Sequence, residues 1–384
     1  MKERQAVIVA YGRSACCRAR KGSFADTHPI EYSAQVLRGV LNKIPQLPWE
    51  RIDDVILGCA MPVNQMDFNA ARSVARRAGL PNCVPGQTIN RFCSSSLQAI
   101  GTAANAILAG QMDCVVAGGT EAMSMCFHQP QEEYKDKLLD EQDVGIYMSM
   151  GETAERMAER YEISRVEMEQ MAVESHRKAH AAQISGKLAP SIIPVVNAHG
   201  ETITQDEGIR PGTSLETLAG LKPCFRENGR VTAATSSQTT DASAFAVVMS
   251  SEMAEELGIR PIARFVSFAV AGCEAQVMGL GPIHAVPKAL AKAGLRVEDM
   301  DVIELNEAFA SQAIACMREL KLPAEKVNPY GGAMALGHPM GATGVFLTGK
   351  ALDYLQDQGG RYALVTMCIG GGMGAAGVFE LLGQ

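Results

Sequence analysis

Short apolar runs alternate along the chain with longer stretches of helical periodicity, and this alternation predicts the architecture. The runs VVAGG at residues 115–119 and ALVTM at residues 363–367 fit strands that are buried on both faces. The stretches before them, residues 94–110 and 342–360, have the length and periodicity of helices. Strands that alternate with helices in this way predict βαβ units and a mostly parallel sheet.

The second half of the chain repeats the pattern of the first. Residues 40–60, VLNKIPQLPWERIDDVILGCA, and residues 289–308, ALAKAGLRVEDMDVIELNEA, share a helix, a polar corner and an acidic strand entry. Aligning Asp54 with Asp301 gives an offset of 301 − 54 = 247 residues. The helical stretches that follow Cys93 and His338 recur at 338 − 93 = 245 residues. A chance likeness between two unrelated βαβ units is the alternative explanation.

The pattern changes between the halves. Residues 129–143, QPQEEYKDKLLDEQD, are polar and are predicted to form a surface loop. A helical pattern follows, in which Ser164 is placed to cap a helix with Glu167 three residues further on. We therefore predict an N-terminal half at residues 1–122 plus 240–261, a covering loop domain at residues 123–239 and a C-terminal half at residues 262–384.

Composition and charge exclude several classes of protein. The net charge is −7 and no basic stripe with interleaved aromatic residues occurs, so nucleic acid is not an expected partner. Nowhere do about 18 uncharged apolar residues follow one another, so no membrane span is expected. The 11 cysteines include no C-x-x-C pair and no cysteine–histidine cluster with metal-ligand spacing. We expect reduced thiols, no metal site and a soluble cytoplasmic protein.

Cys93 is the first candidate for chemistry, because it lies in NRFCSSSLQA at the predicted start of a helix. Free N–H groups and the positive end of the helix dipole favour a thiolate there, so we expect a thiolate near neutral pH. The three small serines that follow are expected to leave space for a ligand. The alternative is an ordinary buried cysteine, which is common for this residue type.

His338 lies in a glycine-rich stretch, NPYGGAMALGHPMGATG, whose backbone can approach a ligand closely. In the repeat it takes the position that Cys93 has in the first half, so pseudo-symmetry would bring both helix starts to one place. A cysteine and a histidine that meet in this way form a nucleophile and its activator. A purely structural histidine is the alternative.

Two further segments end buried strands with polar or flexible residues. Cys368 precedes glycines at 370, 371 and 372, whose N–H groups are able to hold an oxyanion. Asn306 and Glu307 follow another strand, at a place where polar residues commonly face a crevice. A glycine crossover needed only for packing, and structural pairing of Asn306 and Glu307, are the alternatives.

Four motifs occur in order over the whole chain: NRFCSSSLQA, NEAFA, GGAMALGHPMG and TMCIGGGMG. Together with AGGTEAMS, MGETAE, IRPGTSLETLAGLKPCF and VTAATSSQTTDAS, they resemble the thiolase family. The resemblance implies the five-layered αβαβα thiolase fold, an α/β fold of two pseudo-symmetric halves with an inserted loop domain. It also implies cleavage of 3-ketoacyl-CoA by CoA to acetyl-CoA and a shortened acyl-CoA.

The resemblance assigns roles to the residues that match its motifs. Cys93 is then the nucleophile, and His338 activates it and donates to one oxyanion. Asn306 supports the same oxyanion through a water, while the N–H groups of Cys93 and Gly370 form a second oxyanion hole. Cys368 is the acid/base that protonates the departing acetyl-CoA carbanion. The other matching positions are Arg210, Thr217, Phe225, Ala233 and Ser237 for CoA, and Met278 and Phe309 for the acyl pocket.

The resemblance also implies partners. CoA and acyl-CoA are the expected substrates, and no further cofactor is implied. Family members form dimers, and segment 124–149 is shorter than in tetrameric members, so a homodimer is expected. A hydratase/dehydrogenase subunit of a β-oxidation complex is a further candidate partner.

Departures from the family pattern leave the acyl-chain length open. Ser96 stands where many short-chain members have glycine, and TSS at 235–237 replaces a version with asparagine. Both variants are more similar to degradative thiolases, whereas Ser149-Met150-Gly151, at the H-M-G position of short-chain enzymes, favours neither. Acetyl-CoA acetyltransferase is the alternative, and a non-catalytic acyl-CoA-binding subunit is a remote one. A ketosynthase is disfavoured, because the second cysteine motif around Cys368 is complete.

Overall fold

A mixed sheet forms the frame of the protein in the computed structural model, which describes residues 4–127 and 132–383. Its strands follow the order β10-β11-β12-β9-β1-β8-β5-β3-β4, with β2 beside β8, and β6 and β7 form a separate pair. The strands are β1 (Ala6–Arg13), β2 (Cys17–Arg18), β3 (Asp54–Gly58), β4 (Gln87–Ile89), β5 (Cys114–Ala122), β6 (Val195–Val196), β7 (Thr202–Ile203), β8 (Thr240–Ser250), β9 (Ala263–Gly272), β10 (Val302–Leu305), β11 (Tyr362–Ile369) and β12 (Met373–Leu381).

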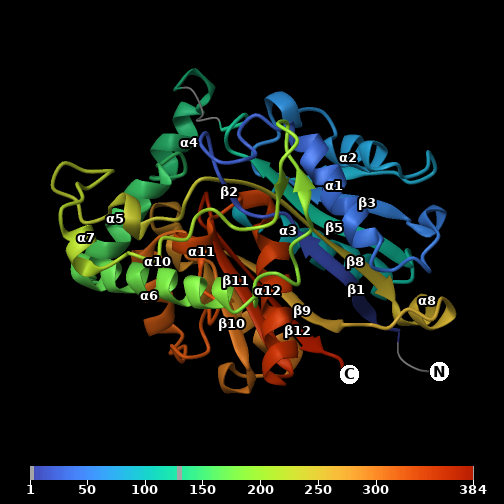
Figure 1. The fold of residues 1–384 in the computed structure, drawn as a ribbon. Coiled ribbons are helices and arrows are strands. Elements are labelled where there is room, and N and C mark those ends of the chain that lie inside the picture. The colour runs from blue at the N-terminus through green and yellow to red at the C-terminus, as the bar shows by residue number, and fades with distance from the viewer. Residues whose placement is uncertain (1–3, 128–131, 384) are drawn as a thin grey trace.

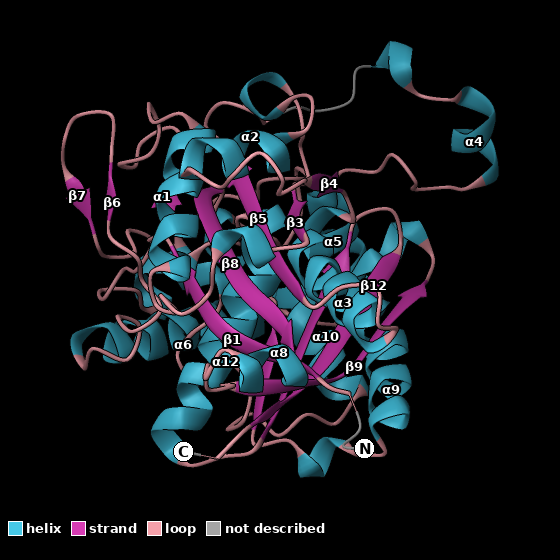
Figure 2. Cartoon of the chain, turned by 90° about the vertical axis from the view of Figure 1, so that its right-hand side faces the viewer, coloured by secondary structure: helices cyan, strands magenta, loops and turns pink. Residues whose placement is uncertain are grey.

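Helices lie on both sides of the sheet and between its two halves (Figures 1 and 2). They are α1 (Pro29–Leu41), α2 (Ala70–Ala78), α3 (Ser95–Leu108), α4 (Lys137–Gln142), α5 (Met150–Arg160), α6 (Arg165–Ile184), α7 (Leu215–Ala219), α8 (Ser251–Glu256), α9 (Gly281–Ala293), α10 (Ala310–Glu319), α11 (Ala333–Leu336) and α12 (Thr343–Gln358). Helices α3 and α12 pack against each other and against strands of both halves. They form the middle of five layers, so the predicted αβαβα fold is confirmed.

Three apolar clusters hold these layers together. The central cluster contains Leu97 of α3 and Leu352 of α12, together with the inward-facing residues of both sheet halves. A second cluster joins α1 and α2 to the outer face of the N-terminal strands, and a third joins α9 and α10 to the C-terminal strands. Neighbouring residues of β1 alternate between the first two clusters, as Ile8 and Val9 do. This period of two along a fully buried strand explains the continuous apolar runs in the sequence.

The two halves are related by a pseudo-repeat whose offset differs from the predicted one. The starts of three pairs of elements give 302 − 54 = 248, 343 − 95 = 248 and 362 − 114 = 248 residues. The carboxylate of Asp53 accepts hydrogen bonds from the N–H groups of Asp113 and Cys114, and that of Asp301 accepts them from Arg361 and Tyr362. Asp301 therefore corresponds to Asp53, and the predicted offset of 247 was one residue too small.

The prediction of a mostly parallel sheet was wrong. Strand β3 pairs in parallel with β4 and β5, and β10 does so with β11, as the βαβ pattern predicted. The pairs β5–β8, β8–β1, β1–β9, β9–β12 and β12–β11 are antiparallel. The reason is local for β11 and β12, because a short glycine turn joins them and only antiparallel strands can be joined so tightly. The βαβ unit is thus only the outer part of each half.

Residues 123–239 leave the N-terminal half after β5 and return at β8. Helices α5 and α6 pack against α10, while β6 lies against α1, so the segment contacts both halves. A buried ion pair fastens it, because both nitrogens Nη1 and Nη2 of Arg13 in β1 donate to the Asp206 carboxylate at 2.6 and 2.8 Å. The exact domain boundaries stay a prediction.

Two local predictions in this segment have different outcomes. The Ser164 hydroxyl accepts a hydrogen bond from the Glu167 N–H, and the Glu167 carboxylate accepts one from the Ser164 N–H, so the predicted cap is confirmed. The predicted loop at residues 129–143 was only partly right. Residues 128–131 lie outside the described part of the chain, and α4 follows them with Asp136 as its N-cap. Helix α4 stands away from the body of the protein (Figure 2).

The described residues contain neither a helix that could cross a membrane nor a disulfide bond. No helix within residues 4–127 and 132–383 combines the length and the apolar character that crossing a bilayer requires. All eleven cysteines are free thiols.

Candidate active site

Cys93 lies in a tight turn that joins β4 to α3. The preceding residue, Phe92, has a positive φ of 42°, a conformation that costs a non-glycine residue roughly 1–3 kcal/mol. Asn90 Oδ1 accepts a hydrogen bond from the Phe92 N–H at 2.8 Å. The Ser95 hydroxyl accepts from the Arg91 N–H at 2.9 Å and donates to the Phe92 carbonyl at 2.7 Å. These bonds hold the strained turn that presents Cys93 at the start of α3.

The serines after Cys93 do not leave space for a ligand, contrary to the prediction. All three are fully buried. Ser95 closes the turn, and Ser96 Oγ accepts a hydrogen bond from the Val345 N–H of α12 at 3.0 Å. Small hydroxyl residues are needed here because α3 and α12 approach closely. Ser96, which differs from the glycine of many short-chain members, therefore joins the two helices.

Two glycines, Gly344 in α12 and Gly119 in β5, permit this close approach. A Cβ atom on Gly344 would lie 2.2 Å from the Leu97 backbone nitrogen. A Cβ on Gly119, in β5, would lie 2.0 Å from the Gly341 carbonyl oxygen. Both distances are far below a normal contact, so the two helix starts fit together only without side chains. The turn that contains Cys93 consequently packs against the 3₁₀ turn Met340–Ala342 that follows His338.

His338 is buried, and its ring is fixed from both sides. Thr343 Oγ1 lies 2.7 Å from Nδ1, and Asn306 Nδ2 lies 3.4 Å from Nε2. Because an amide nitrogen only donates, Nε2 accepts and Nδ1 carries the proton. Burial lowers the pKa of His338 to about 4, so the ring is neutral at neutral pH. A neutral ring with a free-base Nε2 is able to take a proton.

His338 is not the repeat equivalent of Cys93. Cys93 precedes its helix start by 95 − 93 = 2 residues and His338 by 343 − 338 = 5 residues. With the offset of 248 found above, Cys93 corresponds to Gly341 and not to His338. The two side chains nevertheless belong to adjacent helix starts, so the sequence argument reached the correct neighbourhood by an approximate alignment.

Cys368 and Gly370 complete the cluster from β11 and the turn after it. The Gly370 N–H is hydrogen-bonded to the Cys93 sulfur and favours its thiolate. Cys368 is fully buried, which raises its pKa well above the usual range, and a negative charge on Cys93 raises it further whenever Cys93 is ionised. The turn needs glycine, because Gly371 and Gly372 have φ values of 76° and 80°. Cys93, Cys368 and Gly370 are thus brought together.

The expectation of a Cys93 thiolate at neutral pH was wrong. Burial raises the pKa of Cys93 to about 11, although the N–H groups of Gly370 and of Cys93 itself act in the opposite direction. The carboxylate of Glu121 also raises it. The helix start supplies the predicted N–H groups, but desolvation outweighs them in this dry site. Cys93 is a thiol at rest and needs a base during reaction.

Glu121 is a central residue of the site that the sequence reasoning did not assign. Its buried carboxylate accepts hydrogen bonds from the N–H groups of Ala60 at 2.9 Å, Met61 at 3.1 Å and Gly341 at 2.7 Å. Ala60 and Met61 follow β3, and Gly341 precedes α12, so one carboxylate ties the two halves together. The sequence signal that was overlooked is the charged residue near the end of the buried run CVVAGGTEA.

Most of the predicted substrate-binding residues lie close to this cluster. Met278, Phe309 and Cys368 share one apolar cluster, against which Met150 packs. The rings of Phe225 and Phe309 meet edge to face with centroids 6.0 Å apart. The Ser237 N–H donates to the Ala308 carbonyl at 2.9 Å, next to Phe309.

Ala233 and Thr217 lie at the edge of this group. Ala233 opens the 3₁₀ turn Ala233–Thr235, and its neighbour Ala234 packs against the same apolar cluster. Thr217 lies on α7, where its hydroxyl accepts from the Ser214 N–H at 3.0 Å and donates to the Ser214 carbonyl at 2.9 Å. That hydroxyl is already used within its own turn.

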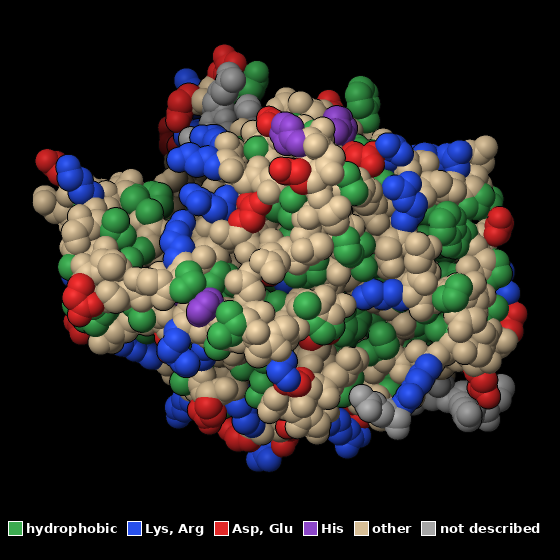
Figure 3. All heavy atoms as spheres, viewed as in Figure 1, with side chains coloured by type: hydrophobic (Ala, Val, Ile, Leu, Met, Phe, Trp, Pro, Cys, Tyr) green, Lys and Arg blue, Asp and Glu red, His purple; other side chains and the backbone are tan. Residues whose placement is uncertain are grey.

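Arg210 lies at the surface, on a segment that is adjacent to the segment of Ser237. The side chain of Gln238 connects them, because Nε2 donates to the Gly208 carbonyl at 2.9 Å. Figure 3 shows a band of lysine and arginine side chains between the lobe that contains α5 and α7 and the body of the protein.

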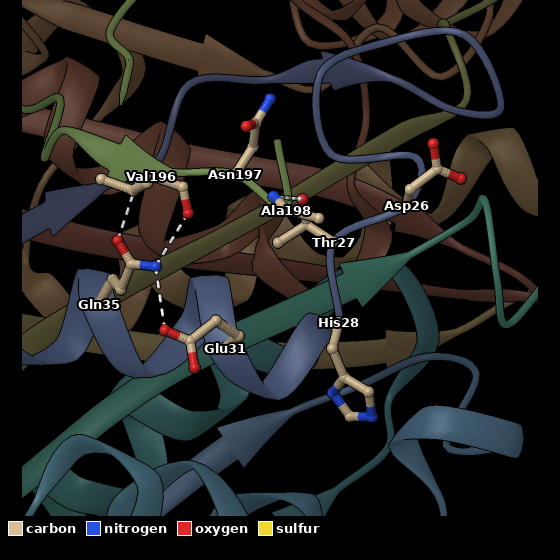
Figure 4. A pocket seen from close by; sticks show the side chains of 8 residues that line it. All are labelled: Asp26, Thr27, His28, Glu31, Gln35, Val196, Asn197 and Ala198. Atoms are coloured by element: carbon tan, nitrogen blue, oxygen red, sulfur yellow. Dashed lines mark hydrogen bonds between the residues drawn. The ribbon is translucent and has the colours of Figure 1, made fainter. Parts of the chain in front are cut away.

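A surface hollow of about 570 Å³ lies elsewhere, between the start of α1 and the β6–β7 pair (Figure 4). Gln35 spans it, with Nε2 donating to Glu31 Oε1 at 3.1 Å and to the Val196 carbonyl at 3.0 Å. None of the predicted site residues lines it. The hollow therefore does not mark the candidate active site.

Comparisons with known proteins agree with this geometry. The family model described as "Thiolase, N-terminal domain" matches residues 6–252, and "Thiolase, C-terminal domain" matches residues 259–381. A 3-ketoacyl-CoA thiolase of Bacillus subtilis is 44% identical over 98% of this chain and 100% of its own length. A 3-oxoadipyl-CoA/3-oxo-5,6-dehydrosuberyl-CoA thiolase of Escherichia coli is 45% identical over 94% of this chain and 95% of its own. The crystal structure of a Bacillus anthracis acetyl-CoA acetyltransferase superimposes with a TM-score of 0.92 at 38% identity, covering 99% of both chains.

The close approach of α3 and α12 predicts the effect of one added methyl group. Gly344→Ala should lower the free energy of unfolding by about 1–3 kcal/mol, because its Cβ meets the backbone of Leu97. Gly220→Ala is the matched control, since nothing lies within 4 Å of its Cβ. Denaturant unfolding of both variants measures the difference. Equal stability of the two variants would contradict the close approach.

Proposed function

This chain belongs to the thiolase family, and on that premise we propose that it is a 3-ketoacyl-CoA thiolase, an acetyl-CoA C-acyltransferase. It cleaves 3-ketoacyl-CoA with CoA into acetyl-CoA and an acyl-CoA shortened by two carbons. The observation that carries the proposal is the meeting of the Cys93 and Cys368 thiols with the Gly370 N–H, next to the turn that follows the neutral imidazole of His338. Packing alone does not explain why these four groups, which come from separate parts of the chain, lie in one region.

In the first half-reaction, Cys93 attacks the 3-keto carbon of the substrate. The sulfur–carbon bond forms while Nε2 of His338 takes the thiol proton, because a free Cys93 thiolate is scarcely populated. The bond between C2 and C3 then breaks, and the acetyl-CoA carbanion takes the proton of Cys368. Burial favours that role, since it keeps Cys368 protonated until the carbanion forms.

The second half-reaction returns the enzyme to its starting state. The Cys368 thiolate takes the proton of the incoming CoA thiol, and the CoA sulfur attacks the acyl group on Cys93. The bond between the acyl carbon and Cys93 breaks, and His338 gives back its proton to the Cys93 sulfur. The protons on Cys93, His338 and Cys368 therefore balance over one turnover.

Two sets of donors are available for the oxyanions of these steps. The N–H groups of Cys93 and Gly370, which meet at the Cys93 sulfur, would hold the thioester oxygen once Cys93 is acylated. Nε2 of His338, after it has taken a proton, would donate to the other oxygen with Asn306, which acts through a water. The backbone of Asn306 is held at the end of β10, because its N–H donates to the Thr366 carbonyl at 3.0 Å.

The partial reactions separate the roles of the two cysteines. Cys368→Ala should abolish proton exchange at the methyl group of acetyl-CoA but leave some acylation of Cys93, whereas Cys93→Ala should abolish acylation. Mass spectrometry after incubation with acetyl-CoA, which acylates Cys93 without forming a carbanion, and exchange of the acetyl-CoA methyl protons with deuterated water measure the two steps. An acyl label on any other cysteine, or equal loss of both steps in the Cys368 variant, would contradict the assignment. The same assay over a series of acyl-chain lengths separates a degradative enzyme from an acetyl-CoA acetyltransferase.

A homodimer in the cytoplasm is the proposed form of the enzyme. Strand β4 ends the strand path and leaves one backbone edge open to pairing with a second copy. Phe68, 94% exposed, lies beside that edge, because the Asn69 side chain contacts Thr88 Oγ1 of β4 at 3.0 Å. A hydratase/dehydrogenase partner remains a prediction from the family resemblance.

The dimer proposal predicts a specific sensitivity to charge at this edge. Phe68→Asp should weaken self-association, because it places a carboxylate on an apolar contact, while Ile184→Asp, at the end of α6, should not. Ile184 is also exposed, at 73%, and serves as the matched control. Light scattering at micromolar concentration measures the mass. A stable tetramer, or a dimer that is indifferent to Phe68→Asp, would overturn the proposal.

A further inference from the structure

Three arginines differ from all others in the described part of the chain. The guanidinium groups of Arg18, Arg20 and Arg210 make no hydrogen bond or ion pair, whereas every other arginine within residues 4–127 and 132–383 makes at least one. Arg20 is partly occupied, because its guanidinium lies over the ring of Phe127 at 6.0 Å from the centroid. Arg18 and Arg210 have no such partner.

The backbone places Arg18 and Arg210 on adjacent segments. Glu207 fixes both, since its N–H donates to the Cys16 carbonyl at 3.1 Å and its carboxylate accepts from the N–H groups of Arg18 at 3.1 Å and Ser23 at 2.9 Å. The Arg210 N–H donates to His176 Nδ1 at 3.1 Å. The Glu207 carboxylate therefore accepts hydrogen bonds from backbone N–H groups. It does not pair with either guanidinium.

The two guanidinium groups are close enough to affect each other. The pKa of Arg210 is lowered by partial burial and then by the positive charge of Arg18. Two like charges held together without an acid between them are unfavourable in the free protein. They become favourable when a dianion lies between them, because each planar fork can bind phosphate oxygens in a bidentate way.

We propose that Arg18 and Arg210 together hold the 3′-phosphate at the nucleotide end of CoA. This inference rests on the proposed function, and it goes beyond the family match, which points to Arg210 alone. The 3′-phosphate is a monoester that carries close to two charges, and it is the outermost anionic group of CoA. Arg18 ends β2 and is exposed, so a phosphate at the surface can reach its guanidinium. The pair would make the enzyme prefer CoA to carriers without that group.

The contact is tested by a cycle that removes each partner in turn. KM is measured for CoA and for dephospho-CoA, which lacks the 3′-phosphate, with the wild type and with Arg18→Ala. Removal of one exposed arginine–phosphate contact should raise KM for CoA about fivefold. KM for dephospho-CoA should change less than about twofold, and kcat for either carrier should stay the same. Arg18→Lys should recover part of the preference, because it keeps the charge but not the fork.

Arg20→Ala is the matched control. It removes the same charge from the same loop, so it reports the long-range effect of net charge on CoA without the local contact. Thermal unfolding of Arg18→Ala should occur at no lower temperature than that of the wild type, because the Arg18 guanidinium makes no hydrogen bond or ion pair with a described residue and its charge repels that of Arg210. A destabilised Arg18→Ala variant would therefore contradict the unpartnered state on which the inference depends.

Direct binding distinguishes this inference from the proposed function. Calorimetry with adenosine 3′,5′-bisphosphate and with ADP requires no catalysis, so it gives a result even if thiolysis is absent. We expect the bisphosphate to bind the wild type more tightly than ADP does. We expect the two ligands to bind Arg18→Ala with equal affinity. In Arg18→Ala, an equal rise in KM for CoA and dephospho-CoA, or no rise for either, would overturn the assignment of the 3′-phosphate to this pair.

Discussion

The close approach of two helix starts from different halves is the constraint on which the rest of the structure depends. Helices α3 and α12 begin side by side because Gly344 leaves no side chain against the backbone of Leu97, and Gly119 of β5 leaves none against Gly341 before α12. The carboxylate of Glu121 then bonds to N–H groups of both halves and fixes their distance. The turn that contains Cys93 and the turn that follows His338, 338 − 93 = 245 residues further along the sequence, pack against each other through this junction. The outer layers of the fold support it with apolar packing.

The same junction decides the chemistry, because it buries Cys93 and His338. Desolvation raises the pKa of Cys93 to about 11 and lowers that of His338 to about 4, so both groups are neutral at rest. A dry pair of neutral groups avoids the cost of a buried ion pair. It also leaves the N–H groups at the Cys93 turn free for the charge that develops on the substrate. Cys93, the proposed nucleophile, must therefore lose its proton during attack.

Much of this could be predicted from the sequence. Periodicity and the internal repeat indicated two βαβ units, and four motifs indicated the family, the layers and the catalytic cluster. The one-residue error in the offset arose because Asp53 and Asp54 are equally plausible partners of Asp301 in a letter alignment. Only the hydrogen bonds of the carboxylates distinguish them.

Other features depend on tertiary packing, which local patterns do not contain. The antiparallel centre of the sheet follows from strands that return to each half over long distances. The buried roles of Ser95 and Ser96 follow from the contact between α3 and α12. The pKa of Cys93 follows from a balance between helix-start N–H groups, which the sequence reveals, and desolvation, which it does not. The unpartnered state of Arg18 and Arg210 likewise becomes visible only when the hydrogen bonds and ion pairs of the other described arginines are known.

The protonation state of the resting Cys93 tests the account most directly. The ultraviolet absorbance of a thiolate can be followed during a pH titration of the wild type and of Cys93→Ser, and the difference between the two curves isolates Cys93. The account predicts no thiolate signal from Cys93 at about pH 7 and a rise only above about pH 9. A full thiolate signal at about pH 7 would mean that Cys93 and His338 form an ion pair at rest, and it would contradict the neutral junction.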